Sequence, residues 1–127
     1  MKKYRYSKDP DTYFNDGIEK YKERDYTGAV SDLSITIELS PNHHIAYYTR
    51  GLIYGKELKK FKKSINDFTK AIELKADYAE AYFNRGVTYL IFDYIKKACA
   101  DWHKAKELGY EPAGELIDKY CNIINKP

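Results

Sequence analysis

The chain has 127 residues, which suits one compact domain, and its formal net charge is only +3. No apolar run approaches the roughly 18 residues of a membrane-spanning helix, so we expect no membrane partner. The basic start MKKYRYSKDP lacks a following apolar segment. It therefore does not resemble a secretory signal, and we expect a cytoplasmic protein.

The first predicted segment is a basic arm at residues 1–9, in which Lys2, Lys3, Arg5 and Lys8 precede any acidic residue. The remaining 18 basic residues nearly balance the 19 acidic ones. One interpretation is a frayed tail that improves solubility, and the other is an arm that contacts nucleic acid or an acidic partner. A nearly neutral body argues against a broad phosphate-binding face.

Three copies of one sequence motif follow at almost constant spacing. TYFNDGIEKY begins at Thr12, AYYTRGLIY at Ala46 and AYFNRGVTY at Ala81. A second amphipathic segment follows each motif, with apolar residues three and four positions apart, so both halves of each unit are predicted to be helices. Turn signals such as Asp25 and Asp93 separate these helices. A constant period of this length is typical of a helical repeat.

Each first helix carries a glycine that is matched by a small residue in the second helix. A glycine inside a helix costs about 1 kcal/mol relative to alanine, so three matched glycines imply that paired helices approach closely. The matched residues are Gly17 with Ala29, Gly51 with Ser64, and Gly86 with Ala98. The second unit has one extra residue between Gly51 and Phe61, which we expect in the turn between its helices.

The last predicted helix begins at Pro112 and provides the polar cap that a stack of repeats needs at its open end. Its apolar stripe consists of Leu116, Ile117, Tyr120 and Ile124.

The two cysteines, Cys99 and Cys121, do not have the spacing of a metal site. We expect reduced structural thiols, as is usual inside cells, and a disulfide is the alternative. Neither thiol has the basic surroundings of a reactive cysteine.

The repeats resemble those of the tetratricopeptide repeat family, whose motif is shown best by Tyr82, Gly86, Tyr89, Ala98 and Trp102. The resemblance covers about residues 10–112. The sequence is also similar to those of small bacterial members of the family. It implies an all-α fold, a right-handed α-solenoid of three helix pairs plus a C-terminal capping helix. The expected segments are the arm at 1–9, repeats at 10–43, 44–78 and 79–112, and a capping helix with tail at 113–127.

In this family the first helices of the pairs line a concave groove that receives partners. The corresponding faces here form an apolar strip beside a short polar row. Phe14, Tyr48 and Phe83 are the expected anchors, because aromatic residues often dominate interface energies. The alternative is that these residues are partly buried between helices or covered by the arm. The predicted groove residues are Phe14, Asn15, Ile18, Tyr21, Tyr48, Thr49, Leu52, Phe83, Asn84, Val87 and Leu90.

Family members that hold the acidic tails of heat-shock chaperones use Lys, Asn and Arg side chains on these first helices as a carboxylate clamp. The corresponding places here hold Phe14, Ile18, Thr49, Glu80 and Asn84. The clamp chemistry is absent and Glu80 would repel a carboxylate, so we do not expect that role.

A second regularity involves charged residues. Asp32, Asp67 and Asp101 occupy equivalent places, and Arg50 and Arg85 directly precede the glycines of the second and third copies. Because the second helix of one unit packs on the first helix of the next, we predict inter-repeat pairs Asp32–Arg50 and Asp67–Arg85. The alternative is that all four side chains point into water.

Catalytic motifs are missing from the sequence. There is no glycine-rich phosphate loop, nucleophile elbow or paired-carboxylate motif, so we expect no enzyme, no cofactor and no small-molecule substrate. His43 and His44 have no further ligands nearby that would complete a metal site. His103 is expected to be exposed or packed at the cap.

We therefore expect a non-enzymatic adaptor that binds a peptide or helix of a partner protein in the groove through apolar anchors. One alternative is a homo-oligomerisation module, for example a homodimer, that uses the same groove. A less favoured alternative is a nucleic-acid-associated protein that binds through the basic arm.

Overall fold

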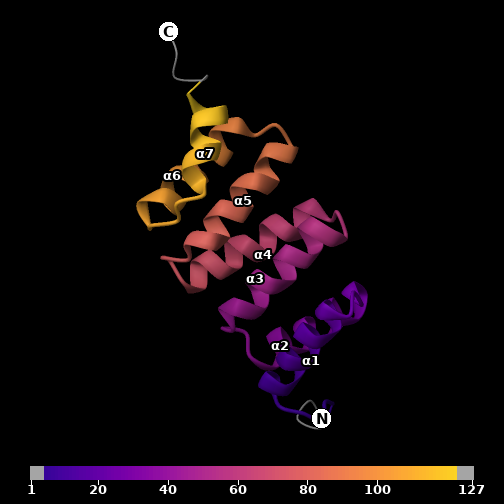
Figure 1. Ribbon diagram of the computed structural model, residues 1–127. Helices are drawn as coiled ribbons and strands as arrows, with labels where there is room; N and C mark the ends of the chain where they lie inside the picture. Colours follow the sequence, from indigo (N-terminus) through magenta and orange to yellow (C-terminus); the bar gives the residue numbers. More distant parts are fainter. Residues whose placement is uncertain (1–4, 123–127) are drawn as a thin grey trace.

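The computed structural model describes residues 5–122, in which seven α-helices and two π-helical turns occur and no strand. Figure 1 shows them stacked in chain order from the N-terminal to the C-terminal end. The π-helical turns η2 (Ile53–Glu57) and η3 (Ile117–Cys121) extend α3 and α7. The helices are α1 (Pro10–Lys22), α2 (Tyr26–Leu39), α3 (His44–Leu52), α4 (Phe61–Leu74), α5 (Ala79–Ile91), α6 (Ile95–Glu107) and α7 (Ala113–Leu116).

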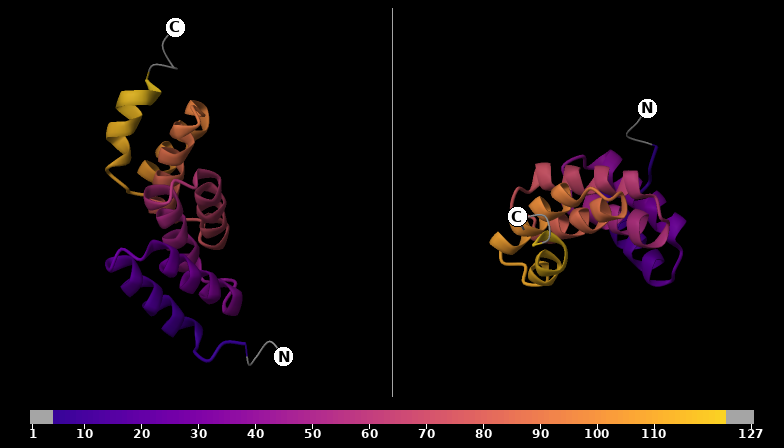
Figure 2. Two further views of the ribbon diagram at one scale, coloured as in Figure 1. Left: turned by 90° about the vertical axis from the view of Figure 1, so that its right-hand side faces the viewer. Right: turned by 90° about the horizontal axis from the view of Figure 1, so that it is seen from above.

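The helices form three antiparallel pairs, α1 with α2, α3 with α4, and α5 with α6. Each second helix also packs on the first helix of the next pair, and the stack curves as it progresses (Figure 2). The predicted α-solenoid of three pairs with a C-terminal cap is confirmed. Among the described helices, none is long and apolar enough to cross a membrane.

The close approach of paired helices at the glycines is confirmed. A Cβ atom added to Gly86 would lie 2.6 Å from Nε1 of Trp102, and one added to Gly51 would lie 3.0 Å from Cε1 of Phe68. Trp102 and Phe68 are both buried. The Ser64 hydroxyl faces Gly51 and donates a hydrogen bond of 2.9 Å to the Gly51 carbonyl oxygen.

The arginines form their ion pairs within a repeat, so the predicted pairs Asp32–Arg50 and Asp67–Arg85 are wrong. Arg50 donates two hydrogen bonds of 2.8 and 2.7 Å to Asp67. Arg85 donates two bonds of the same lengths to Asp101. The aspartate lies beside the point where the two helices of one pair approach most closely, and it therefore meets the arginine of its own pair.

Contact with the preceding repeat is made by the remaining arginine nitrogen. Nη1 of Arg50 donates to the Ser34 hydroxyl at 3.0 Å, and Nη1 of Arg85 donates to the Thr69 hydroxyl at 3.1 Å. Each arginine therefore links the two helices of its own pair to the second helix of the pair before.

In the first repeat, the carboxylate of Asp32 accepts a hydrogen bond of 2.6 Å from Lys20. Burial raises the pKa of the Asp67 and Asp101 carboxyls above the ordinary value, and the hydrogen bonds from the arginines oppose that rise.

The capping segment differs from its prediction in two ways. The helix α7 has only four residues and continues as η3 to Cys121, and Ile124 lies outside the described residues. Cys121 forms a disulfide with Cys99 of α6, with 5.7 Å between their Cα atoms. The expectation of reduced thiols is therefore wrong, because the capping segment folds back along α6 and brings the two residues together.

Candidate functional site

The second repeat differs from the others at the end of its first helix. The structure places its extra residue in η2, where the helix widens and the Leu58 N–H bonds the Ile53 carbonyl oxygen at 3.1 Å. The expectation that this residue lies in the turn between the helices is wrong. Single-turn π-helical segments of this kind absorb one residue and are frequent at functional sites.

Gly55, inside η2, stands where the first and third repeats carry large apolar residues. Tyr21 and Leu90 occupy the equivalent position, four residues after the motif glycine. An added Cβ at Gly55 would lie 2.8 Å from the Ser64 hydroxyl oxygen, so the backbone lies directly against α4. The second repeat therefore lacks the side chain that the other two place there.

A cavity of about 340 Å³ lies at this point, and we name it the α3–α5 pocket. It opens between α3 with η2 on one side and α5 on the other, and α4 contributes to its lining. The pocket is lined by Gly51, Leu52, Gly55, Lys56, Lys59, Phe61, Phe68, Asn84, Val87, Thr88 and Ile91.

The lining is mostly apolar and partly open to solvent. Phe68 is only 2% exposed, whereas Val87 is 36% and Ile91 53% exposed on α5. Lys56 and Lys59 are exposed and contribute the only charged side chains of the lining. The pocket can therefore take up an apolar group from outside, with positive charge beside it.

Three of the predicted groove residues, Leu52, Asn84 and Val87, line this pocket. They come from the first helices of the second and third repeats, as expected from the sequence. The Asn84 amide is already engaged, because it donates hydrogen bonds of 3.1 Å to the Tyr48 hydroxyl and 3.0 Å to the Glu80 carbonyl oxygen.

The predicted anchors are half-buried, and each packs against another ring of its own chain. Phe14 stacks on His43 with 4.9 Å between ring centroids. Tyr48 packs on Tyr78 at 4.8 Å, and burial raises the pKa of Tyr48 to about 12. The third anchor, Phe83, packs at 4.9 Å on Tyr110, which follows the third pair. These rings contribute to the joints between repeats.

The remaining predicted groove residues lie away from the pocket. Asn15 is exposed, and Ile18 and Thr49 are half-buried. Tyr21 packs on Tyr26, while Leu90 packs against the core of the third repeat.

The basic arm also lies elsewhere. Arg5 forms an ion pair of 3.0 Å with Glu38 of α2, and Lys8 forms one of 3.0 Å with Asp16. Lys2 and Lys3 lie outside the described residues.

Most of the pocket residues that the sequence analysis missed belong to the second repeat. Gly55, Lys56 and Lys59 belong to the segment with the extra residue, and Ile91 lies at the end of α5. Two signals could have found them: the glycine where the other copies have Tyr21 and Leu90, and the one-residue insertion beside it.

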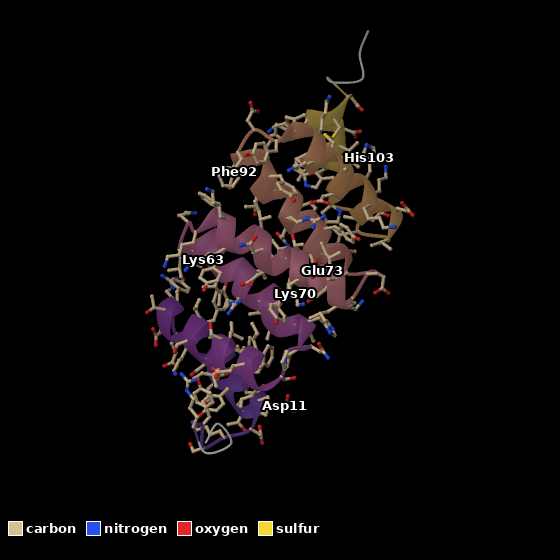
Figure 3. The ribbon with its side chains drawn as sticks, turned by 180° about the vertical axis from the view of Figure 1, so that it is seen from behind. Asp11, Lys63, Lys70, Glu73, Phe92 and His103 are labelled. Carbon is tan, nitrogen blue, oxygen red and sulfur yellow. A yellow bond between two sulfur atoms is a disulfide. The ribbon has the colours of Figure 1, made fainter. Side chains whose placement is uncertain are left out.

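His43 and His44 have structural roles. Nδ1 of His43 accepts a hydrogen bond of 3.1 Å from the Ala46 N–H and so caps α3. His44 packs edge-on against Tyr78, and His103 is exposed on α6 (Figure 3). Within the part of the chain that the structure describes, no group of three or more His, Cys, Asp or Glu residues is placed to hold a metal ion.

Comparison with known proteins confirms the resemblance seen in the repeats. Residues 56–90 match the family model described as TPR repeat. A search of the curated proteins gives no significant match.

Several solved structures share the fold. The first TPR of Spaghetti (RPAP3), bound to the HSP90 peptide SRMEEVD, has a TM-score of 0.86 at 21% identity, covering 95% of this chain and 97% of that one. The Arabidopsis OM64 TPR domain has a TM-score of 0.79 at 24% identity, covering 87% and 94%. MamA has a TM-score of 0.77 at 24% identity, covering 84% of this chain and 61% of that one.

Proposed function

Because the chain carries a TPR repeat at residues 56–90 and has the fold of tetratricopeptide-repeat proteins, we propose that it is a non-enzymatic adaptor. It binds a peptide or helix of another protein through an apolar anchor. The observation that carries the proposal is the α3–α5 pocket, an open and mostly apolar cavity of about 340 Å³. A few well-packed apolar anchors usually supply most of the binding energy of such interfaces.

The comparison with the first TPR of Spaghetti supports a peptide as the class of ligand, because that domain is bound to one. The mode of binding proposed here does not use a carboxylate clamp. Phe14 and Ile18 are apolar, and Glu80 is exposed and negatively charged where a clamp would need cations.

We propose that the partner makes its main contact in the pocket. Leu52 and Val87, both predicted from the sequence, form part of its wall. Phe14, Tyr48 and Phe83 remain predicted contacts, but their replacement by alanine would also remove packing between repeats. A variant that changes only the pocket is therefore the better test.

The experiment selects ligands for the full chain from a phage-displayed library of random dodecapeptides. Val87→Gln/Ile91→Gln makes the α5 wall polar without adding charge, and both residues are exposed enough for the fold to tolerate the change. Ile45→Gln is the matched control, since Ile45 is 45% exposed and lies outside the pocket. Recovered peptides should bind the control as they bind the unchanged protein and should lose binding to the double variant. Equal binding to both variants would refute the pocket as the site.

Self-association is the second candidate, because Val87 and Ile91 expose apolar surface that a second copy could cover. Light scattering over a concentration series distinguishes the two functions. A dimer that the double variant abolishes would favour self-association, and a strict monomer would exclude it. Nucleic-acid binding through the arm is the least favoured function, since Arg5 and Lys8 are already paired with carboxylates.

A further inference from the structure

A row of lysines extends from the α3–α5 pocket along the turns within the second and third repeats. All of them are exposed, and across residues 5–122 none forms an ion pair with a carboxylate. Six lysines elsewhere in the chain do form such pairs. The row, which we name the lysine edge, consists of Lys56, Lys59, Lys60, Lys62, Lys63, Lys96 and Lys97.

Five of these lysines, Lys60, Lys62, Lys63, Lys96 and Lys97, oppose the electrostatics of the helix N-termini at which they lie. Lys60 is the N-cap of α4, and Lys62 and Lys63 follow in its first turn, which contains no acidic residue and no side-chain cap. A helix N-terminus carries partial positive charge, so each cation there costs roughly 0.3–1 kcal/mol at low ionic strength. In the first repeat, α2 begins instead with Asp25, which accepts from the Gly28 N–H at 3.0 Å. Helix stability alone therefore does not account for the lysines.

The lysine edge is continuous with the pocket. Lys56 and Lys59 line the pocket, and Phe61 lies between it and a shallow hollow bounded by Lys60, Lys62, Lys63 and Phe92. The rings of Phe61 and Phe92 meet edge-to-face with their centroids 6.3 Å apart. Figure 3 shows Lys63 and Phe92 on one side of the stack and Glu73 and His103 toward the other. A ligand in the pocket would thus have a row of cations beside it.

We propose that the partner segment is acidic next to its apolar anchor, and that its carboxylates lie along the lysine edge. This inference rests on the proposed function, because the anchor occupies the same pocket. A nucleic acid would neutralise the lysines with phosphates but would leave the apolar walls of Leu52, Phe68 and Val87 without a partner. A protein segment that combines one bulky apolar side chain with several Asp or Glu residues satisfies both features.

The test uses the dodecapeptides recovered on the full chain. They should be enriched in Asp and Glu beside an apolar residue. Lys60→Glu/Lys62→Glu should weaken their binding by about tenfold or more at low ionic strength, with a smaller effect at high salt. The melting temperature of this variant should not fall, because the change removes cations from the N-terminus of α4. Lys70→Glu/Lys106→Glu changes the net charge equally away from the edge and should alter binding by less than about twofold.

The other outcomes separate this inference from the function on which it rests. Peptides that need Val87 and Ile91 but show no acidic enrichment, or bind the Lys60→Glu/Lys62→Glu variant unchanged, would overturn the acidic partner and keep the adaptor. Recovery of no pocket-dependent peptide would overturn both. Poly(U) RNA or phosphatidylserine vesicles are tested alongside. If either bound more tightly than the peptides, and depended on the lysines but not on the pocket, the ligand would be a nucleic acid or a membrane surface instead.

Discussion

Replacement of Gly86 by alanine tests the packing between paired helices most directly. The new Cβ would lie 2.6 Å from Nε1 and 2.8 Å from Cδ1 of Trp102, which is fully buried and donates a 3.3 Å hydrogen bond to the Phe83 carbonyl oxygen. Carbon atoms do not approach a rigid ring this closely, so the indole must shift or the helices must separate. Overpacking of this kind costs about 1–3 kcal/mol, and the better helix propensity of alanine returns about 1 kcal/mol.

We therefore expect Gly86→Ala to lower the free energy of unfolding by up to about 2 kcal/mol, and the melting temperature by about 3–5 °C per kcal/mol for a chain of this length. Gly17→Ala is the matched control, because its Cβ would meet its nearest neighbours at 3.3 Å. Small shifts accommodate that contact, and the change in free energy should stay within about 0.5 kcal/mol. Urea titrations followed by circular dichroism and by the fluorescence of the single tryptophan measure both variants. Equal losses in both variants, or no loss in Gly86→Ala, would refute the reasoning.

Three further predictions concern other contacts. Arg85→Met leaves the buried Asp101 carboxyl without its cation and should cost about 3–5 kcal/mol at neutral pH. Since the native pKa of Asp101 is then raised further above the unfolded value, the free energy of unfolding of this variant should fall as the pH rises through the native pKa, measured by denaturation from acid to neutral pH. Reduction of the Cys99–Cys121 disulfide should lower the free energy of unfolding by about 3 kcal/mol, and a thiol assay should detect both cysteines only after reductant is added. Tyr48→Phe, which removes the acceptor of one hydrogen bond, should cost about 0.5–1.5 kcal/mol in the same titration.

Much of the fold could be predicted because the same pattern of packing residues occurs in each of the three repeats. Gly17, Gly51 and Gly86 mark the close contact in each pair, and the period of the apolar residues fixes the helices. The partners of Arg50 and Arg85 could not be predicted in this way. The period shows which residues are equivalent, but only the tilt between helices decides whether an arginine meets the aspartate of its own pair or of the one before.

Only part of the candidate site could be predicted, because the equivalence of the repeats identifies some of its residues but not the pocket itself. Leu52, Asn84 and Val87 follow from the equivalence of the repeats, because they lie on the faces of first helices that the tyrosine and glycine motif does not use. The pocket itself arises where that equivalence fails, at Gly55 and the inserted residue of η2. The disulfide was missed for another reason, since the return of the capping segment along α6 depends on tertiary packing that the spacing of Cys99 and Cys121 does not reveal.

The two ends of the stack differ in local stability, so we expect unfolding to begin at one end and to proceed toward the other. The C-terminal end is covalently closed by the Cys99–Cys121 bond, whereas the aspartate of the first repeat has a single bond from Lys20 in place of an arginine fork. In a linear array each unit contacts only its neighbours, so opening begins where the terminal unit is held least firmly. Amide exchange should therefore be fastest in α1 and α2 and slow progressively toward α6. A partner bound at the α3–α5 pocket would hold α3 and α5 together, so local unfolding that begins at the first repeat would stop there.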